Sequence, residues 1–416
     1  MALGSRGDVQ PYIALGQGLV DADRDVRLIT HDDYQALIAA YGLPFRSVRG
    51  NVQAVVESPE MAALIEQGDF LAVTRRTARE AERVVPQWAE DALAACQGMD
   101  LLVAGIGGLY LGLALAEKLD LPLLQAYLVP FSPTRAFPSV LLPPSLPRLG
   151  GFLNRISHHL TRQVMWQGFR AADRIARSQV LDLHRAPFFG PYKNKRLQQL
   201  PILHAYSPAV LPKPPDWAAN VHVTGYWFLD QAGDWTPPSE LLDFLEQGPA
   251  PVYIGFGSMS QRDPEGTARL VVQALNEADL RAVISSGWGG LRSTDVPANV
   301  FTIDAIPHAW LFPRMKAVVH HGGAGTTAAG IRAGVPALVV PFFGDQFFWG
   351  QRIADLNVGP SPIPRKELTA RRLAQALGDA VSDTTMRRRA AALGEIVRAE
   401  SGVGRAVTII TEVAAY

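Results

Sequence analysis

Hydrophobic positions along the 416-residue chain form two series in which short apolar strands alternate with amphipathic helices. This alternation is typical of βαβ units, which build parallel sheets. The first series predicts strands at 26–30, 100–104 and 123–128 and helices at 9–20, 71–95 and 108–119. The second series predicts strands at 252–255, 281–285, 300–303, 317–320 and 337–340. The pattern therefore predicts an α/β fold with two doubly wound, Rossmann-like domains.

A proline-rich stretch without sustained periodicity separates the two series. We therefore predict an N-terminal domain at 1–206, a linker at 207–239 and a C-terminal domain at 240–416, which ends in helices. Ligands of open α/β sheets bind beyond the carboxyl ends of the strands. Two such domains facing each other would form an interdomain cleft, and we expect the chemistry there.

Composition removes several classes of protein from consideration. The 39 Lys and Arg residues balance the 39 Asp and Glu residues, which argues against a dedicated nucleic-acid binder. The single cysteine, Cys96, provides neither an internal disulfide nor a cysteine metal cluster, so we expect a cytoplasmic protein. The chain does not start with a secretion signal. Its longest uncharged run, residues 101–116, is shorter than the ~20 residues of a membrane span.

A glycine-rich turn in the second half predicts an anion site. A buried strand runs into His320, His321, Gly322 and Gly323, and a helix starts near Thr326. Free N–H groups at a helix start attract phosphate, although such a turn also serves tight packing. The turn lacks the Gly-Lys-Ser/Thr of a P-loop. Because side chains alternate along a strand, the two histidines point to opposite sides, and one of them is expected in the core.

Two further segments follow predicted strands in this half. Asp345 and Gln346 combine acceptors and donors suited to the hydroxyls of a sugar ring, while Asp345 is also a candidate N-cap. Ser258 follows a glycine turn after the strand at 252–255. The three sites are therefore expected along one edge of the sheet.

The first half carries the segment Gly4-Ser5-Arg6-Gly7-Asp8 before a helix. Asp8 is either a helix cap or a general base, and a carboxylate of ordinary pKa near ~3.9 needs loss of water to act as a base. Two Asp-x-Asp patterns within residues 21–25 precede the strand at 26–30, at the end away from the ligand edge. We interpret them as a solvated turn and not as a metal site.

Two segments carry a resemblance: GSRGDVQPYIALGQGL at residues 4–19 and VVHHGGAGTTAAGIRAGVPALVVPFFGDQFFWG at residues 318–350. They resemble the sterol glucosyltransferase and glycopeptide glycosyltransferase branch of the nucleotide-sugar-dependent family with the GT-B fold. The resemblance implies two facing Rossmann-like domains, with the acceptor in the first and the donor in the second. It also implies inverting transfer from a nucleotide diphosphate sugar without a metal or other cofactor.

The resemblance also implies roles for single residues. Asp8 matches the proposed catalytic base, and Asp345 with Gln346 matches the pair that contacts the sugar. The diphosphate site of the family matches His321, Gly323, Gly325 and Thr326. A further donor contact matches Ser258. The segment that contacts the nucleobase matches Ile306 and His308. Plant members use a histidine base in the first loop, which is absent here. Members carry a full strand before the first motif, whereas three residues precede Gly4 here.

The acceptor side contains a basic and an apolar segment. Residues 155–196 carry nine Lys and Arg against two Asp, with apolar residues at helical spacing before and among them. Residues 152–196 are therefore either a contact with an anionic membrane surface or a solvated basic helix. The apolar, proline-broken stretch 129–147 predicts a mobile loop that forms a hydrophobic wall for the acceptor.

The expected function is inverting transfer of a hexose, with UDP-glucose as donor, to a hydroxyl of a lipophilic small molecule such as a sterol, polyketide or flavonoid. Preorganised donors at the departing diphosphate would supply most of the catalysis, with Asp8 as base. The alternatives are a nucleotide-sugar-binding protein without turnover and a nucleotide-sugar epimerase. Nucleotide release in the presence of an acceptor separates them.

Overall fold

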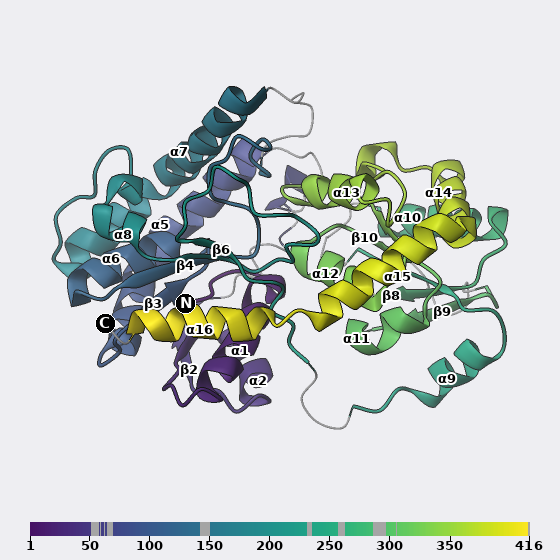
Figure 1. Cartoon of the computed structure of the whole chain (residues 1–416), viewed down its shortest axis with the longest axis horizontal. Helices are drawn as coiled ribbons and strands as arrows, with labels where there is room; N and C mark the ends of the chain where they lie inside the picture. Colours follow the sequence, from purple (N-terminus) through teal and green to yellow (C-terminus); the bar gives the residue numbers. More distant parts are fainter. Residues whose placement is uncertain are drawn as a thin grey trace. The chain divides into compact units, whose positions relative to one another are not determined.

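The computed structural model of the chain contains two α/β units, each built on parallel strands (Figure 1). It describes all residues except 51–57, 59, 62, 65–69, 142–149, 231–234, 257–262, 286–296, 305 and 415–416. The first unit comprises Met1–Val56, Phe70–Asp230 and Glu400–Tyr416. The second unit comprises Glu57–Asp69 and Gln231–Ala399. The predicted α/β class with two Rossmann-like halves is confirmed.

The second unit is built on a parallel sheet with the strand order β11-β10-β7-β8-β9. Its strands are β7 (Val252–Gly255), β8 (Ala282–Ser285), β9 (Val300–Ile303), β10 (Val318–His320) and β11 (Ala337–Val339). The chain builds outward from β7 through β8 to β9, then crosses to the other side of β7 to form β10. The order therefore reverses between β7 and β10, which is where open α/β sheets bind ligands.

Helices cover both faces of this sheet. They are α9 (Ser239–Glu246), α10 (Pro264–Glu277), α11 (His308–Leu311), η5 (Phe312–Arg314), α12 (Ala324–Ala333), α13 (Gln346–Asp355), η6 (Arg365–Glu367), α14 (Ala370–Ser382) and α15 (Thr384–Ala399). Helix α10 packs with α14, and α12 packs with α11 and α15. A Cβ on Gly330 of α12 would lie 3.2 Å from Val318, and one on Gly350 of α13 would lie 3.1 Å from Val339. Since Val318 and Val339 lie on the same sheet face as His320, α12 and α13 cover that face.

Parallel strands of the first unit form a four-stranded sheet and a two-stranded sheet. They are β1 (Leu28–His31) paired with β2 (Phe45–Val48), and β3 (Leu102–Ala104), β4 (Leu123–Tyr127), β5 (Ile202–His204) and β6 (Val221–Val223) in that order. The buried residues 1–3 connect the two sheets. The Ala2 N–H donates to Ile29 of β1, and the Met1 carbonyl accepts from the Gly105 N–H after β3. The segment that follows, at Gly4, therefore leaves the sheet where the strand order reverses.

The helices of the first unit include one from the C-terminal end of the chain. They are α1 (Arg6–Val20), η1 (Asp32–Tyr34), α2 (Gln35–Ala39), α5 (Phe70–Cys96), α6 (Leu109–Leu119), α7 (Gly150–Ala176), η2 (Arg177–Leu181), η3 (Pro191–Lys193), α8 (Lys195–Gln199) and α16 (Gly402–Ala414). Helix α16 packs on α1, where a Cβ on Gly18 would lie only 2.4 Å from Val403 Cγ1. A glycine therefore permits this close helix pair.

The boundaries of the units differ from the predicted 1–206, 207–239 and 240–416 at two places. Residues 207–230 belong to the first unit and contain β6 and the buried Trp227. Residues 400–416 also belong to the first unit, because α16 buries Ala406 and Ile410 in the core shared with α1. The many prolines of the first segment led to the prediction of a linker there. For the second segment, helical periodicity alone does not reveal which domain a helix covers.

Candidate functional site

The start of α12 lies at the reversal point of the second sheet, directly after β10. Gly322 adopts φ +94°, in the left-handed region, and a Cβ there would lie 2.5 Å from Val339 and 3.0 Å from the Gln346 carbonyl oxygen. The glycine therefore allows the turn after β10 to approach the start of α13. The first N–H groups of a helix have no intrahelical partner, so Ala324, Gly325 and Thr326 point theirs out of the helix start. A Cβ on Gly325 would meet no atom within 4 Å.

The two neighbouring histidines diverge, as predicted. Their ring planes are inclined by 83° and their centroids are 6.5 Å apart. His320 is fully buried, and its Nδ1 accepts a hydrogen bond of 3.0 Å from the Gly322 N–H. Burial lowers the pKa of His320 well below its ordinary value, so the ring is neutral. His320 is thus the core member of the pair.

His321 is the member that faces the start of α12. A Cβ on Gly323 would lie 2.5 Å from its Nε2, so only glycine leaves room for the ring there. Desolvation lowers the pKa of His321 to about 4, and its buried Nδ1 has no partner among the described residues. The ring is therefore a neutral hydrogen-bonding group at physiological pH and adds no fixed positive charge.

Asp345 and Gln346 follow β11, the strand next to β10. The Gln346 Oε1 accepts from the backbone N–H groups of Phe342 and Phe343 at 2.8 and 3.1 Å, which fixes the loop after β11. Asp345 occupies the N-cap position of α13 without a side-chain capping bond, and its Oδ2 accepts from Trp349 Nε1 at 2.9 Å. Asp345 is therefore the N-cap residue of α13, as one of the two predictions had it, but its side chain bonds Trp349 and caps no backbone N–H.

An aromatic cluster follows β9 on the other side of the reversal point. His308 stacks on Phe312 with centroids 4.3 Å apart, and Tyr253 of β7 contacts both rings. Ile306 is half-buried just before α11. The described residues thus bring the predicted nucleobase segment to the same sheet as the predicted diphosphate turn. Ser258 lies outside the described residues.

In the first unit, Asp8 lies in the first turn of α1. Its Oδ2 accepts hydrogen bonds of 2.8 Å from both the backbone N–H and the Oγ of Ser5. Asp8 is exposed, yet the surrounding protein removes part of the hydration of its carboxyl, and this desolvation raises the pKa. The two hydrogen bonds from Ser5 act in the opposite direction and lower the pKa by less. Asp8 therefore helps to cap α1, while Oδ1 has no hydrogen bond from Ser5.

Comparison with known proteins agrees with this geometry. Residues 1–138 match the glycosyltransferase family 28 N-terminal domain, and residues 269–408 match the erythromycin biosynthesis protein CIII-like C-terminal domain. The sterol 3-beta-glucosyltransferase of Cryptococcus neoformans var. neoformans serotype D is 37% identical over 438 residues, which is 99% of this chain and 27% of that protein. The chain is similar to this glycosyltransferase along nearly its whole length, and its two α/β units have the GT-B fold.

Solved structures share this fold. The glycosyltransferase of kitacinnamycin superposes with a TM-score of 0.70 at 18% identity, over 99% of this chain and 97% of that one. SsfS6 of Streptomyces sp. SF2575, in complex with thymidine diphosphate, gives a TM-score of 0.61 at 18% identity, over 99% and 98% of the two chains. At these identities the match concerns the fold. The chain spans about a quarter of the length of the curated relative given above.

The predicted acceptor loop of this chain is anchored in its described part, residues 129–141. Buried His204 bonds the Val129 carbonyl and Ser132 Oγ, at 3.1 and 3.0 Å. Asp216 accepts from Thr134 Oγ1 at 2.6 Å and from the Arg135 N–H at 2.8 Å. These bonds attach the first part of the loop to the body of the unit, and the predicted mobility of the loop stays a prediction. Residues 142–147 of it lie outside the described part.

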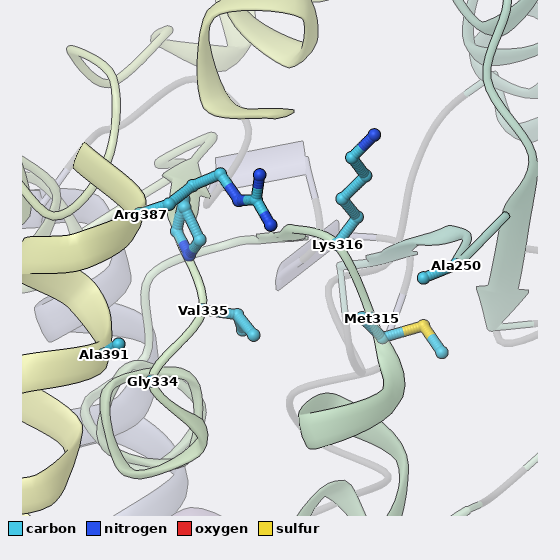
Figure 2. Close-up of a pocket in the computed structure, with 8 residues that line it drawn as sticks. Ala250, Met315, Lys316, Gly334, Val335, Arg387 and Ala391 are labelled. Carbon is cyan, nitrogen blue, oxygen red and sulfur yellow. The ribbon is translucent and has the colours of Figure 1, made fainter. Parts of the chain in front are cut away.

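Other polar features lie away from the reversal points. Asp21 ends α1 and Asp23 forms a left-handed turn before β1, in agreement with a solvated turn. A pocket of about 310 Å³ in the second unit is lined by Lys316, Gly334 and Arg387 among others (Figure 2). Lys316 precedes β10 and Gly334 precedes β11, so this pocket lies at the amino ends of the strands. It is therefore separate from the predicted donor site.

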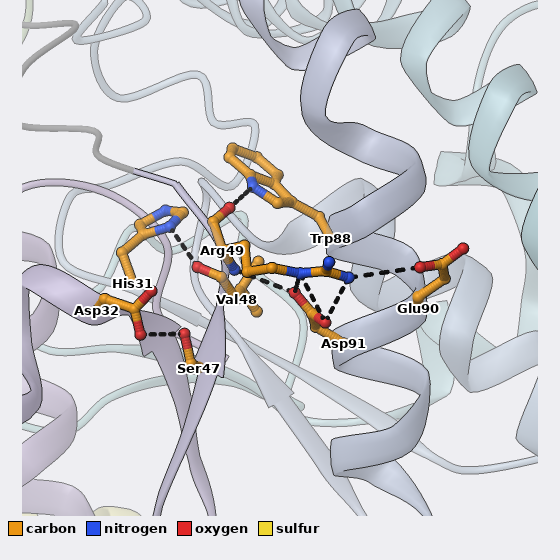
Figure 3. Close-up of polar contacts among 8 residues, drawn as sticks. All are labelled: His31, Asp32, Ser47, Val48, Arg49, Trp88, Glu90 and Asp91. Carbon is orange, nitrogen blue, oxygen red and sulfur yellow. Dashed lines mark hydrogen bonds and ion pairs between the residues drawn. The ribbon is translucent and has the colours of Figure 1, made fainter.

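Sequence reasoning missed a polar cluster at the carboxyl ends of β1 and β2 (Figure 3). Buried His31 shares a hydrogen bond of 3.2 Å with the Val48 carbonyl and packs on Trp88 of α5. Arg49 forms an ion pair of 2.9 Å with Asp91 of the same helix. The signal available in the sequence was the histidine that ends an apolar strand.

No helix within the described residues is long and apolar enough to cross a bilayer.

Proposed function

We propose that this chain is an inverting glycosyltransferase that moves glucose from UDP-glucose to a hydroxyl of a lipophilic small molecule. The observation that carries the proposal is the start of α12, which places free N–H groups and neutral His321 at the reversal point of the second sheet. Departure of a nucleoside diphosphate builds negative charge on phosphate. Preorganised N–H donors stabilise such charge, so no metal or other cofactor is part of the proposal.

The donor assignment follows the neighbouring segments. The diphosphate would contact His321, Gly323, Gly325 and Thr326, and the sugar hydroxyls would contact Asp345 with the Gln346 amide nitrogen. Gln346 Oε1 is already occupied by two backbone N–H groups. The nucleobase would lie against the segment of Ile306 and His308, and Ser258 would add a further contact with the nucleotide sugar. The name of the sterol 3-beta-glucosyltransferase supports glucose as the sugar.

The chemical step assigned to Asp8 is proton acceptance. The acceptor oxygen attacks the anomeric carbon from the face opposite the diphosphate, the bond from that carbon to the phosphate oxygen breaks, and the hydroxyl proton passes to Asp8. A raised carboxyl pKa makes Asp8 a stronger base than an ordinary aspartate. The step requires the two units to face each other across the predicted interdomain cleft.

The acceptor class is proposed from the apolar loop at 129–141 and from the names of the relatives, which act on sterols. Val129, Phe131 and Val140 of this loop are buried and give it an apolar packing surface.

The test is a transfer assay with purified chain. UDP-glucose is incubated with a sterol, a flavonoid and a macrolide in the presence of EDTA, and products are identified by mass and by the configuration of the anomeric carbon. A β-linked glucoside with release of UDP is expected. UDP-glucose that is bound without UDP release would indicate a binding protein, and conversion of the sugar without acceptor would indicate an epimerase.

A further inference from the structure

Large apolar side chains are exposed on one surface of the first unit. Of the nine that are exposed among the described residues, six lie between residues 152 and 189. Four lie on α7 and two lie in the turn after η2, and we call them together the α7 apolar face: Phe152, Leu153, Ile156, Leu160, Phe188 and Phe189. Phe152 is 72% exposed and Phe189 is 65% exposed. Such clustering marks a surface that is covered by a partner.

These side chains form one continuous strip. Residues 152, 156, 160, 163 and 167 lie on one side of a helix because their spacing follows its turns. Gln163 Nε2 donates to the Phe189 carbonyl at 2.8 Å, and Gln167 Nε2 donates to the Phe188 carbonyl at 2.8 Å. The turn with the two phenylalanines is thus held where the apolar strip of α7 ends.

Exposed cations lie in the same segment. They are Arg155, Arg174, Arg185, Lys193, Lys195 and Arg196, of which Arg196 forms an ion pair with Asp120. Of the two acidic residues between 150 and 196, Asp173 is buried in an ion pair with Arg177, so Asp182 is the one exposed acid there. This segment is strongly basic although the whole chain has no net charge.

The opposite side of α7 holds the acceptor loop. Asn154 Nδ2 donates to the Arg135 carbonyl at 3.0 Å, and Ser157 Oγ accepts from the Ser139 N–H at 2.8 Å. Burial lowers the pKa of His158 to about 4, so its neutral ring donates from Nε2 to the Phe137 carbonyl at 3.0 Å. The helix that carries the α7 apolar face therefore also fixes the loop at 129–141.

We infer that the α7 apolar face docks on the surface of a lipid bilayer that contains anionic lipid, and so brings the acceptor loop to an acceptor dissolved in that bilayer. The second part rests on the proposed function. Apolar side chains on one strip of a helix with cations beside them fit the boundary between headgroups and acyl chains. Both the apolar and the cationic groups contribute to such binding, whereas an apolar protein partner would require only the first.

The docking test measures sedimentation with vesicles and needs no activity. The wild-type chain is compared with the double variant Phe152→Ser/Leu160→Ser and with the control Ile396→Ser, an apolar residue of α15 that is about as exposed as Leu160. Binding to vesicles of phosphatidylcholine with phosphatidylglycerol is expected for wild type and control, and about tenfold weaker binding is expected for the double variant. Binding should also weaken at high salt and on vesicles of phosphatidylcholine alone.

Equal binding of all three proteins, or no binding of the wild type, would overturn the docking. So would a wild type that is dimeric in solution where the double variant is monomeric, because the face would then be a protein interface.

A second arm separates docking from the proposed function. Transfer to a water-soluble flavonoid should be the same in wild type and double variant, whereas transfer to a sterol held in anionic vesicles should fall about tenfold in the variant. Vesicle binding without any transfer would contradict the proposed function and leave the docking standing. Equal transfer to the vesicle-held sterol by both proteins would overturn delivery of the acceptor by the docked face.

Discussion

At the scale of single residues, the carboxylate of Asp8 combines a structural and a proposed chemical role. Both bonds from Ser5 reach Oδ2, which fixes the side chain at the start of α1. Oδ1 is therefore the oxygen that we expect to accept the proton. A cap fixed in this way holds the base in one orientation and requires little reorganisation when the proton is transferred.

Replacing Asp8 by Asn should lower kcat by about three orders of magnitude and leave the Kd for UDP unchanged, because the amide can keep the Ser5 bonds but cannot take a proton. The raised pKa of Asp8 adds a pH dependence. The wild-type kcat/KM should fall as the pH drops through that raised pKa, since the carboxyl becomes protonated. Steady-state kinetics and calorimetry provide the measurements. Asp21→Asn, at the other end of α1, is the control, and an active Asp8→Asn would remove the assignment.

His321 should make donor binding pH-dependent. Its pKa is about 4 in the free protein, and a diphosphate beside the ring would raise that pKa. UDP-glucose affinity should therefore rise as the pH falls from 7 and level off below the free-protein pKa. Titration calorimetry across this range should show the slope in the wild type and in the control His184→Gln, an exposed histidine of the first unit. A slope that persists in His321→Gln would exclude the ring from the diphosphate site.

At the scale of elements, the start of α12 contains one glycine that packing requires less than ligand binding would. Gly322 and Gly323 are constrained by neighbouring protein atoms, whereas a Cβ on Gly325 would enter open space. The protein therefore does not need glycine at 325 for its own packing. A ligand that lies against the backbone there would need it.

Gly325→Ala should leave the protein folded and stabilise it by up to about 0.5 kcal/mol, because alanine favours helix more than glycine does. UDP binding should weaken about tenfold or more, since the methyl group would hold phosphate away from the free N–H groups. Thermal unfolding and calorimetry measure the two effects. Gly378→Ala in α14, where a Cβ also meets open space, is the matched control. Unchanged UDP binding in Gly325→Ala would place the diphosphate elsewhere.

At the scale of the whole molecule, the chain crosses between the units more than once, and its last helix belongs to the first unit. The Ser207 Oγ donates to Glu400 at 2.6 Å, which ties the beginning of the returning segment to the first unit. The stability of the first unit therefore depends on residues at both ends of the chain.

Gly18→Val should show this dependence. The added side chain would overlap Val403 of α16 and destabilise the first unit by about 2 kcal/mol. Calorimetric unfolding with and without UDP separates the units, because the ligand raises only the transition of the unit that binds it. The variant should lower the transition that UDP does not shift. The control is Gly378→Val in α14, a helical glycine whose Cβ would meet no atom within 4 Å. A fall confined to the transition that UDP shifts would contradict the assignment of α16.

The sequence by itself determined the α/β class, the principal strands and the position of the glycine turn after β10, because these depend on local periodicity and on residues adjacent in the chain. It did not reveal β2, β5 and β6, which are three or four residues long and include polar positions. Only the tertiary structure decided that α16 covers α1, that Gln346 Oε1 holds its own loop and that the strand order reverses between β7 and β10. Each of these depends on contacts between distant segments, which no local pattern encodes.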